Sequence, residues 1–556
     1  MTSPIRLQLA WSRLLSVVEE QAQALIRTAF GTSTREAGDL SAGVFLPDGH
    51  MLAQAVTGTP GHVNTMAEAV KHFLQAFPLQ TMVEGDVFLT NDPWKGTGHL
   101  FDMTMVTPVF HDSPQGRTVV ALFASTLHVV DVGGIGSSAD GLEIYHEGLL
   151  LPILRFVRAG TVDPAVRAII RANVRDPEQV EGDLFALVAC NDVGARRLHA
   201  LLREFRWTDL QALGQYIMTQ SAQAMRDALA QWPRGTWHAS LVSDGYDAPI
   251  ILQAAVTISD EGVTVDFTGT SDAVARGINV PKNYTDAYTS FGIRCLMGPD
   301  VPNNSGSLGV IRTTAPAGCI LNALHPSPVT ARQVIGQLLP DLVFGALRQA
   351  RPDRVPAEGA SSLWNVQLVG GEPLAGLSAQ QLASVQRGPR FNIVSFSTGG
   401  TGGRPQQDGL SVTAYPSGVR NVSVEILETS APLVFERKEF RVDSGGAGKH
   451  RGGLGQVIEV RHAQHDAAMV VAAAFDRVFH PARGALGGRD GAAGALRLAS
   501  GAVLRPKGRQ LVPAGDRLIV ETAGGAGWGD PAERDPALLA RDHLYGLVTA
   551  TQASTV

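Results

Sequence analysis

Two pairs of residues combine a histidine with an aspartate three positions later, His99 with Asp102 and His128 with Asp131. Neutral imidazole nitrogens and carboxylate oxygens together bind first-row divalent metal ions. No softer thiolate ligand accompanies them, which leaves zinc, manganese and iron(II) open. The spacing is short and also arises by chance, so satisfied polar groups at a strand end are the alternative interpretation.

The residues between the two pairs predict how the pairs meet. Two apolar runs joined by a turn-like segment predict a β-hairpin. A simple register that pairs residue 110 with residue 117 places His99 opposite His128 at the open end of the hairpin. Asp102 then lies one pleat or turn away, so the pattern predicts that these three side chains share one site.

Glycine-rich turns lie on either side of this region, at 90–99 and at 131–141. Glycine lets the backbone approach a ligand closely, and loops at strand ends are common binding sites. Tight turns without a ligand are the alternative explanation of the same residues.

The sequence lacks the common nucleotide-binding and hydrolase motifs. Residues 444–450 resemble a phosphate loop, but Asp443 stands where its first glycine belongs and His450 replaces the serine or threonine. There is no strand-linked GxGxxG, no GxSxG and no HExxH motif. If ATP is used, we expect another chain to bind it.

Composition excludes several classes of protein. The chain has 556 residues, 44% of them hydrophobic, which is typical of a globular protein with several domains. Its net charge of −6 argues against nucleic acid or an anionic membrane as the main partner. Three separated cysteines, no leader-like N-terminus and no apolar run near 20 residues predict a cytoplasmic protein without a membrane span.

The pattern of apolar residues predicts an α+β fold of three domains. These are an N-terminal metal and active-site domain of mixed α/β structure (1–235), a middle α+β domain (236–355) and a glycine-rich, β-rich C-terminal domain (356–556). The segment 351–362 is predicted to be a linker or an exposed loop. Other predicted elements are a helix at 4–30, a hairpin at 42–54, a helix at 64–77, β-structure at 86–131 and 235–270, helices within 161–232, at 283–300 and at 328–350, and a last helix near 535–547.

The chain resembles the B-type subunits of the hydantoinase/oxoprolinase family, which include N-methylhydantoinase B, the C-terminal part of 5-oxoprolinase, the caprolactamase β subunit and subunits of acetone and acetophenone carboxylases. The resemblance spans nearly the whole length. It is carried by segments that include 38–54, 85–110, 127–134, 302–322, 399–416, 424–456 and 522–536.

The resemblance implies a set of metal ligands. It assigns one divalent ion to Asp39, His99, Asp102 and His128, of which only Asp39 was not already indicated by the residues themselves. Asp131 would then orient a ligand or accept a proton. The sequence departs from the family at Val129, where a second histidine is common, and in a longer segment between the two ligand histidines.

The resemblance also implies an activity and a partner. It predicts ATP-dependent opening of a hydantoin, lactam or 5-oxoproline-like ring, with ATP and magnesium bound by a separate hydantoinase A-like subunit in an α2β2 complex. Asp131 and Glu143 are the candidate general bases; a salt bridge within its own segment is the alternative for Glu143. Two other functions stay open: a subunit of an ATP-dependent ketone carboxylase and a non-catalytic scaffold.

Overall fold

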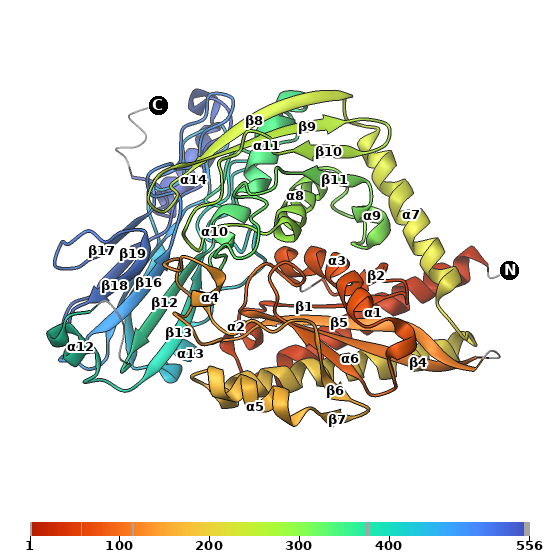
Figure 1. Ribbon diagram of the computed structural model, residues 1–556. Coiled ribbons are helices and arrows are strands. Elements are labelled where there is room, and N and C mark those ends of the chain that lie inside the picture. Colours follow the sequence, from red (N-terminus) through yellow and green to blue (C-terminus); the bar gives the residue numbers. More distant parts are fainter. Residues whose placement is uncertain (1–2, 57, 114–115, 373–376, 550–556) are drawn as a thin grey trace.

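The computed structural model describes residues 3–56, 58–113, 116–372 and 377–549. Within these residues helices and strands are mixed, and the strands form one seven-stranded and three four-stranded sheets. The α+β prediction is therefore confirmed. Figure 1 shows the N-terminal sheet below, a middle helical and β layer above it, and the C-terminal strands along one side.

The N-terminal sheet has the strand order β2-β1-β5-β4-β3-β6-β7. Its long central hairpin, β4 with β5, forms because both strands are rich in apolar residues and are buried on both faces except near the turn. The strands are β1 (Leu40–Phe45), β2 (Met51–Gln54), β3 (Val87–Thr90), β4 (Asp102–Ser113), β5 (Gly116–His128), β6 (Leu154–Arg158) and β7 (Thr161–Val162).

Helices cover both faces of this sheet. Val44 and Phe123 pack with the first and sixth helices, whereas their neighbours Phe45 and Leu122 pack with the third, as the alternation of strand side chains requires. The N-terminal helices are α1 (Pro4–Thr28), α2 (Thr32–Arg35), α3 (Pro60–Ala76), α4 (Ile144–Glu147), α5 (Pro164–Asn173) and α6 (Pro177–Phe205), with a 3-10 turn at Leu79–Thr81.

The predicted hairpin exists, but its predicted register is wrong. Asp102, rather than His99, lies opposite His128. The strands pair further toward the turn than predicted, with Phe110 opposite Val119 and Ser113 opposite Gly116, and an irregularity between Val109 and Phe110 shifts the register by one further residue. A simple count from an assumed turn detects neither effect. His99 consequently lies outside the strand, in the loop that leads into β4.

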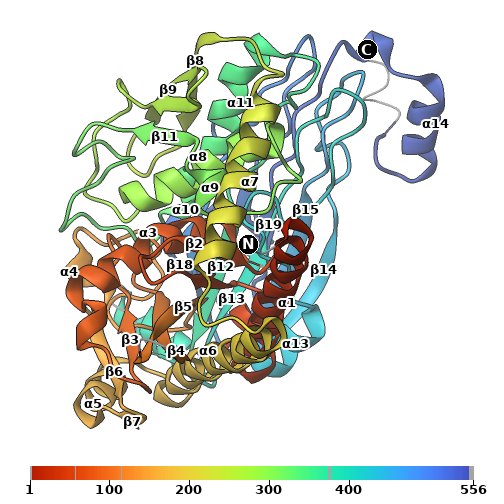
Figure 2. The same cartoon turned by 90° about the vertical axis from the view of Figure 1, so that its right-hand side faces the viewer.

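The middle of the chain packs helices against a second sheet of order β11-β10-β9-β8. Figure 2 shows α7 leading from the N-terminal layer up to this part. The elements are α7 (Gln211–Leu229), β8 (Gly235–Ser243), β9 (Ile250–Ile258), β10 (Val263–Asp266), α8 (Lys282–Leu296), α9 (Ser305–Leu308), β11 (Ile311–Thr314), α10 (Gln333–Gly336) and α11 (Leu339–Ala350).

The C-terminal part has two four-stranded sheets, of order β13-β12-β16-β18 and β14-β15-β19-β17, that share one apolar core. The short helix α14 lies at its outer edge (Figure 2). The elements are β12 (Trp364–Gly370), α12 (Ala379–Val385), β13 (Phe391–Ser397), α13 (Val424–Ser430), β14 (Leu433–Phe440), β15 (Gln456–His462), β16 (Met469–Ala474), β17 (Ala495–Leu498), β18 (Lys507–Val512), β19 (Leu518–Glu521), a 3-10 turn at Pro531–Glu533 and α14 (Pro536–Leu544).

The predicted linker at 351–362 is only partly correct. Residues 352–354 are exposed, but nearly all of 355–362 is buried. Glu358 explains the burial, because its carboxylate pairs there with the buried Arg477. The boundaries of the three domains remain predictions. Among the described helices, none is long and apolar enough to cross a membrane.

Candidate metal centre

Three adjacent strands of the N-terminal sheet bring three of the predicted ligands together at one end of the strands. Asp39 precedes β1, Asp102 begins β4 and His128 ends β5. Because β5 pairs antiparallel with both β1 and β4, these three positions lie side by side. The backbone N–H of His128 donates to the carbonyl oxygen of Asp39 at 3.4 Å, which joins the strand ends directly.

His99, Asp102 and His128 form a buried cluster in which one ligand atom of each lies within 4.8 Å of the others. The Nε2 atom of His99 lies 2.8 Å from Oδ1 of Asp102, and Nδ1 of His128 lies 3.1 Å from the same oxygen. Three of the four residues in the predicted ligand set therefore meet in space.

The contact between Nε2 of His99 and Oδ1 of Asp102 indicates whether these residues fit a metal ion. The other ring nitrogen of His99, Nδ1, lies 2.9 Å from the carbonyl oxygen of Thr330 and must carry the proton that this contact needs. Burial, then the charge of Arg332, lowers the pKa of His99 to about 4, so the ring is neutral near pH 7. The Nε2 lone pair then faces a carboxylate oxygen, with no hydrogen bond between them. A divalent cation between the two atoms would remove this repulsion, so the residues present fit a metal ion.

Asp39 lies beside this cluster. Its Oδ2 atom is 3.9 Å from Nδ1 of His128, and its Oδ1 atom accepts a hydrogen bond from Oγ1 of Thr59 at 3.1 Å. A carboxylate of Asp39 thus lies beside the cluster, and its role as a fourth ligand remains a prediction.

His62, which the sequence reasoning missed, contacts both aspartates. Its Nε2 atom lies 2.9 Å from Oδ2 of Asp102 and 3.6 Å from Oδ1 of Asp39. Burial lowers the pKa of His62, but the charges of the two aspartates outweigh burial and raise it above its usual value. Pro60 is the signal that could have found it, because proline favours the first turn of a helix and α3 begins there rather than at residue 64.

Arg332 is the second residue that sequence reasoning missed. Its Nη2 atom donates to Oδ2 of Asp102 at 2.6 Å, its Nε donates to the carbonyl oxygen of Thr97 at 2.9 Å, and its guanidinium lies 4.2 Å from the ring centre of Tyr284. A Cβ at Gly98, whose φ is +95°, would lie 2.7 Å from this side chain, so a glycine is needed there. No short motif marks Arg332, because it comes from a different part of the chain.

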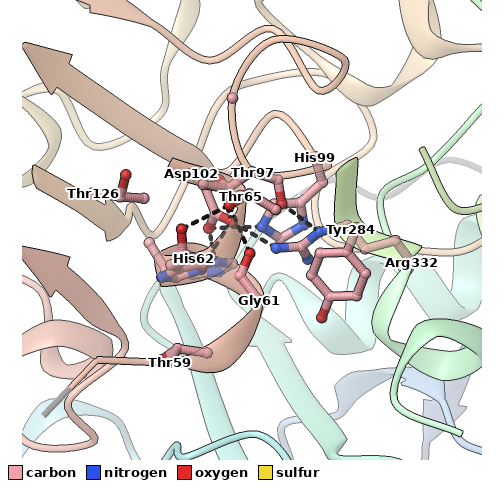
Figure 3. Close-up of polar contacts among 12 residues, drawn as sticks. Thr59, Gly61, His62, Thr65, Thr97, His99, Asp102, Thr126, Tyr284 and Arg332 are labelled. Carbon is pink, nitrogen blue, oxygen red and sulfur yellow. Dashed lines mark hydrogen bonds and ion pairs between the residues drawn. The ribbon is translucent and has the colours of Figure 1, made fainter. Parts of the chain in front are cut away.

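Figure 3 shows His62, His99 and Arg332 converging on Asp102. Burial opposes ionisation of Asp102, but His62 and Arg332 outweigh it and hold the pKa of this carboxyl well below its usual range. Asp102 therefore stays ionised, which is the form that binds a cation.

The two candidate general bases lie in other surroundings. Asp131 is buried, and its Oδ1 accepts hydrogen bonds from Nη1 of Arg175 at 2.8 Å and from the backbone of Gly133 at 3.2 Å. Glu143 is half exposed and lies 3.7 Å from Nε2 of His146, the local contact that was the alternative explanation for it. Neither has a described contact with His99, Asp102 or His128. Their roles as bases stay predictions.

Glu147 holds the backbone loop that positions His99. Its Oε1 atom accepts hydrogen bonds from the backbone N–H groups of Val329 at 2.8 Å and Thr330 at 2.9 Å, and its Oε2 atom has no partner among the described residues. Thr330 in turn accepts the hydrogen bond of His99. Glu147 thus holds the loop that orients the ligand imidazole, and burial raises its pKa to about 8.

Replacing Glu147 with glutamine is expected to flatten the pH dependence of stability. The native protein keeps this proton up to about pH 8, while the unfolded chain releases it near the ordinary glutamate pKa of 4.5. The free energy of unfolding of the wild type therefore falls as the pH rises between these values, and Glu147→Gln, which keeps the acceptor oxygen, avoids the loss. We expect the variant to gain about 3–5 kcal/mol relative to wild type between pH 5 and pH 8 in urea unfolding. Half-exposed Glu143→Gln is the control, and equal pH slopes for Glu147→Gln and wild type would contradict the prediction.

His99 and His128 line a small cavity of about 30 Å³, a volume sufficient for an ion and one or two water molecules. Tyr284, Gln333 and Gln337 line it from the middle of the chain, and Leu363, Asn365, Phe396 and Val419 from the C-terminal part. The site is therefore built from all three parts of the sequence.

Comparison with protein families matches residues 3–531 to the family described as Hydantoinase B/oxoprolinase. An uncharacterized protein of Methanocaldococcus jannaschii is 30% identical, over 95% of this chain and 90% of its own length. A putative B-type subunit of a D-/L-hydantoinase from Pseudomonas sp. is 27% identical, over 99% of this chain and 94% of that protein. The Arabidopsis thaliana protein 5-oxoprolinase 1 is 28% identical over 94% of this chain, which corresponds to only 42% of that protein.

Two solved structures share the fold. The ATP-dependent caprolactamase of Pseudomonas jessenii superimposes with a TM-score of 0.87 at 23% identity, over 99% of this chain and 95% of the other. A nucleotide-free acetone carboxylase superimposes with a TM-score of 0.84 at 20% identity, over 100% of this chain and 79% of the other.

Proposed function

Since this chain belongs to the hydantoinase B/oxoprolinase family, we propose that it is the metal-holding subunit of an ATP-dependent enzyme that opens cyclic amides. The substrate would be a hydantoin, a lactam or a 5-oxoproline-like ring. ATP and magnesium would be bound by a separate A-type subunit, in an α2β2 complex. The observation that carries the proposal is the buried contact at 2.8 Å between the unprotonated Nε2 of His99 and Oδ1 of Asp102, beside a cavity that His99, His128 and Asp39 line.

The names of the similar proteins support this substrate class. They include a B-type hydantoinase subunit and a 5-oxoprolinase, and the caprolactamase that shares the fold is described as ATP-dependent. Hydantoin, 5-oxoproline and caprolactam rings all contain an amide bond within the ring. The absence of a phosphate-loop motif in this chain agrees with ATP binding on a partner.

Asp39, His99, Asp102 and His128 would hold one zinc, manganese or iron ion. When bound, such an ion would polarise the amide carbonyl or lower the pKa of a water molecule. The protein contributes the geometry of this centre: Thr330 fixes the tautomer of His99, and Arg332 and His62 keep Asp102 ionised.

His62 is placed to donate the proton that the ring nitrogen needs when its bond to the carbonyl carbon breaks. Its Nε2 atom is held by Asp102 at 2.9 Å, and its Nδ1 atom has no hydrogen-bond partner among the described residues, although His62 lines the cavity. Asp131 and Glu143 remain the proposed bases from sequence, but neither lines this cavity.

Two amide side chains are placed to bind the ring. The Oε1 atom of Gln333 and the Oδ1 atom of Asn365 are buried and have no hydrogen-bond partner in the described part of the chain, and both residues line the cavity. A buried acceptor without a donor is costly, and a ring N–H group would satisfy it. The cavity of about 30 Å³ is too small for a ring, so substrate entry would require the C-terminal strand that carries Asn365 to move.

The test is an assay of this chain co-expressed with an A-type subunit. Hydantoin, 5-oxoproline and caprolactam are supplied with ATP, with and without bicarbonate, and both ADP and the ring-opened acid are measured. We expect at least one ring to give ADP and acid together without a need for bicarbonate. If turnover of ATP requires bicarbonate and a ketone, the chain is a carboxylase subunit instead. A loaded complex that turns over none of these substrates would favour the scaffold function and overturn the proposal.

A further inference from the structure

A second cavity, of about 240 Å³, lies between the glycine-rich loop that follows β5 and the C-terminal sheet of β12, β13, β16 and β18. Its volume approaches that of ordinary small-molecule sites. It shares no lining residue with the cavity of the metal centre. The loop contributes Gly134, Ile135 and Gly136, which belong to the segment 131–141 already singled out in the sequence.

Arg175 and Arg509, from distant parts of the chain, line this cavity, and they differ in whether a carboxylate lies next to the guanidinium. Arg175 pairs with Asp131 at 2.8 Å and lies 3.8 Å from a carboxylate oxygen of Glu372, which also pairs with Arg390. The guanidinium of Arg509 makes no hydrogen bond or ion pair in the described part of the chain, although its backbone N–H donates to Asp140 at 3.1 Å. Arg509 is thus a partly buried cation that lacks a direct counter-charge within the described residues.

The surroundings of Arg509 make this charge unfavourable unless an anion is present. Burial lowers the pKa of Arg509, and the charge of Arg175 lowers it further, while Asp140 raises it in part. The Nη2 atom of Arg509 lies 3.6 Å from where a Cβ would stand on Gly136, a residue with φ of +76°. A side chain at Gly136 would be strained, and its Cβ would contact the guanidinium, so a glycine here keeps that side of Arg509 uncovered.

The rest of the lining indicates the kind of ligand. Gln367 donates from Nε2 to Oδ1 of Asn392 at 2.9 Å, which leaves the Nδ2 of Asn392 as a further donor, used by no hydrogen bond among the described residues. Ile135, Val369 and Val470 supply apolar surface. Together these groups suit a small organic molecule with an oxyanion group and a short apolar body.

From these contacts we infer that the cavity binds a small organic anion, whose carboxylate or phosphate group is held by Arg509, with Asn392 as a further donor in the same cavity. A planar guanidinium binds two oxygens of either group through parallel hydrogen bonds. Arg175 joins the loop after His128 to the segment after β12, because it bonds to Asp131 and to the carbonyl oxygen of Gly134 and lies 3.8 Å from a carboxylate oxygen of Glu372. The inference stands on this cavity alone and does not depend on the proposed function.

The test is titration of the full chain with inorganic phosphate and, separately, with succinate, by calorimetry and thermal unfolding. Sodium chloride at equal ionic strength serves as the blank. We expect saturable binding of at least one anion to wild type, and a loss of affinity of about tenfold or more in Arg509→Gln. Arg505→Gln is the matched control, because Arg505 is exposed, lies four residues away and does not line the cavity. Tighter binding of phosphate or of succinate shows whether the ligand carries a phosphate or a carboxylate group.

Three outcomes would overturn the inference. The first is the absence of saturable binding of either anion to wild type. The second is unchanged affinity in Arg509→Gln, and the third is an equal loss in Arg509→Gln and Arg505→Gln, which would indicate attraction by net charge alone. If Arg509→Gln does not fold, Asn392→Asp replaces it: a further carboxylate in the lining of the cavity should weaken anion binding, and unchanged binding would contradict the inference.

Discussion

Replacing His99 with alanine is expected to remove the metal ion and to abolish ring opening. His99 supplies the Nε2 lone pair that faces Oδ1 of Asp102 at 2.8 Å, and its other nitrogen is committed to Thr330. Alanine has no donor atom to replace this nitrogen, so we expect the affinity for the metal to fall by at least about a hundredfold. Elemental analysis and the ring-opening assay of the complex measure the two effects.

The matched control for this variant is His238→Ala. His238 is exposed on β8 and has no described side-chain contact. The control should keep both metal and activity, and thermal unfolding should show that His99→Ala still folds. A folded His99→Ala protein that retains the metal and full turnover would exclude His99 as a ligand.

Replacing Arg332 with methionine is expected to cost about 3–5 kcal/mol of unfolding free energy. Arg332 is buried and bonds to both Asp102 and Thr97, so its loss leaves a buried carboxylate and a buried carbonyl short of a donor. Urea unfolding in the presence of a chelator measures this loss without a contribution from bound metal.

Arg13→Met provides the comparison for Arg332→Met. Arg13 pairs with Glu204 at 3.2 Å, but both side chains are more than half exposed. Such a pair contributes about 0–1 kcal/mol. If Arg332→Met costs no more than Arg13→Met, the account of Asp102 as a carboxylate kept ionised by buried partners is wrong.

The sequence predicted the elements of the N-terminal half closely, because they depend on local patterns. The first helix, the early hairpin and the β4–β5 hairpin all follow from apolar periodicity and turn residues. The hairpin register was wrong, because the strands continue to Ser113 and Gly116 and an irregularity near Val109 adds one further residue, and neither feature leaves a mark in composition. The buried half of the predicted linker was also missed, since Glu358 pairs with an arginine more than a hundred residues away.

The candidate site shows the same division between local and long-range information. His99, Asp102 and His128 could be grouped because one hairpin joins them. Asp39 lies on a neighbouring strand and came only from the resemblance. Arg332 and Asn365 come from the middle and the C-terminal part, and a single sequence carries no information on which distant residues complete a cavity. Their contributions depend on tertiary packing alone.

The most direct test of the central claim is the position of the metal. Crystals of the purified complex, measured at the absorption edges of zinc, manganese and iron, would locate the ion by anomalous scattering and identify it. We expect one peak between Nε2 of His99, Oδ1 of Asp102 and Nδ1 of His128, with Asp39 beside it. A complex that opens rings with no metal at this place would contradict the account.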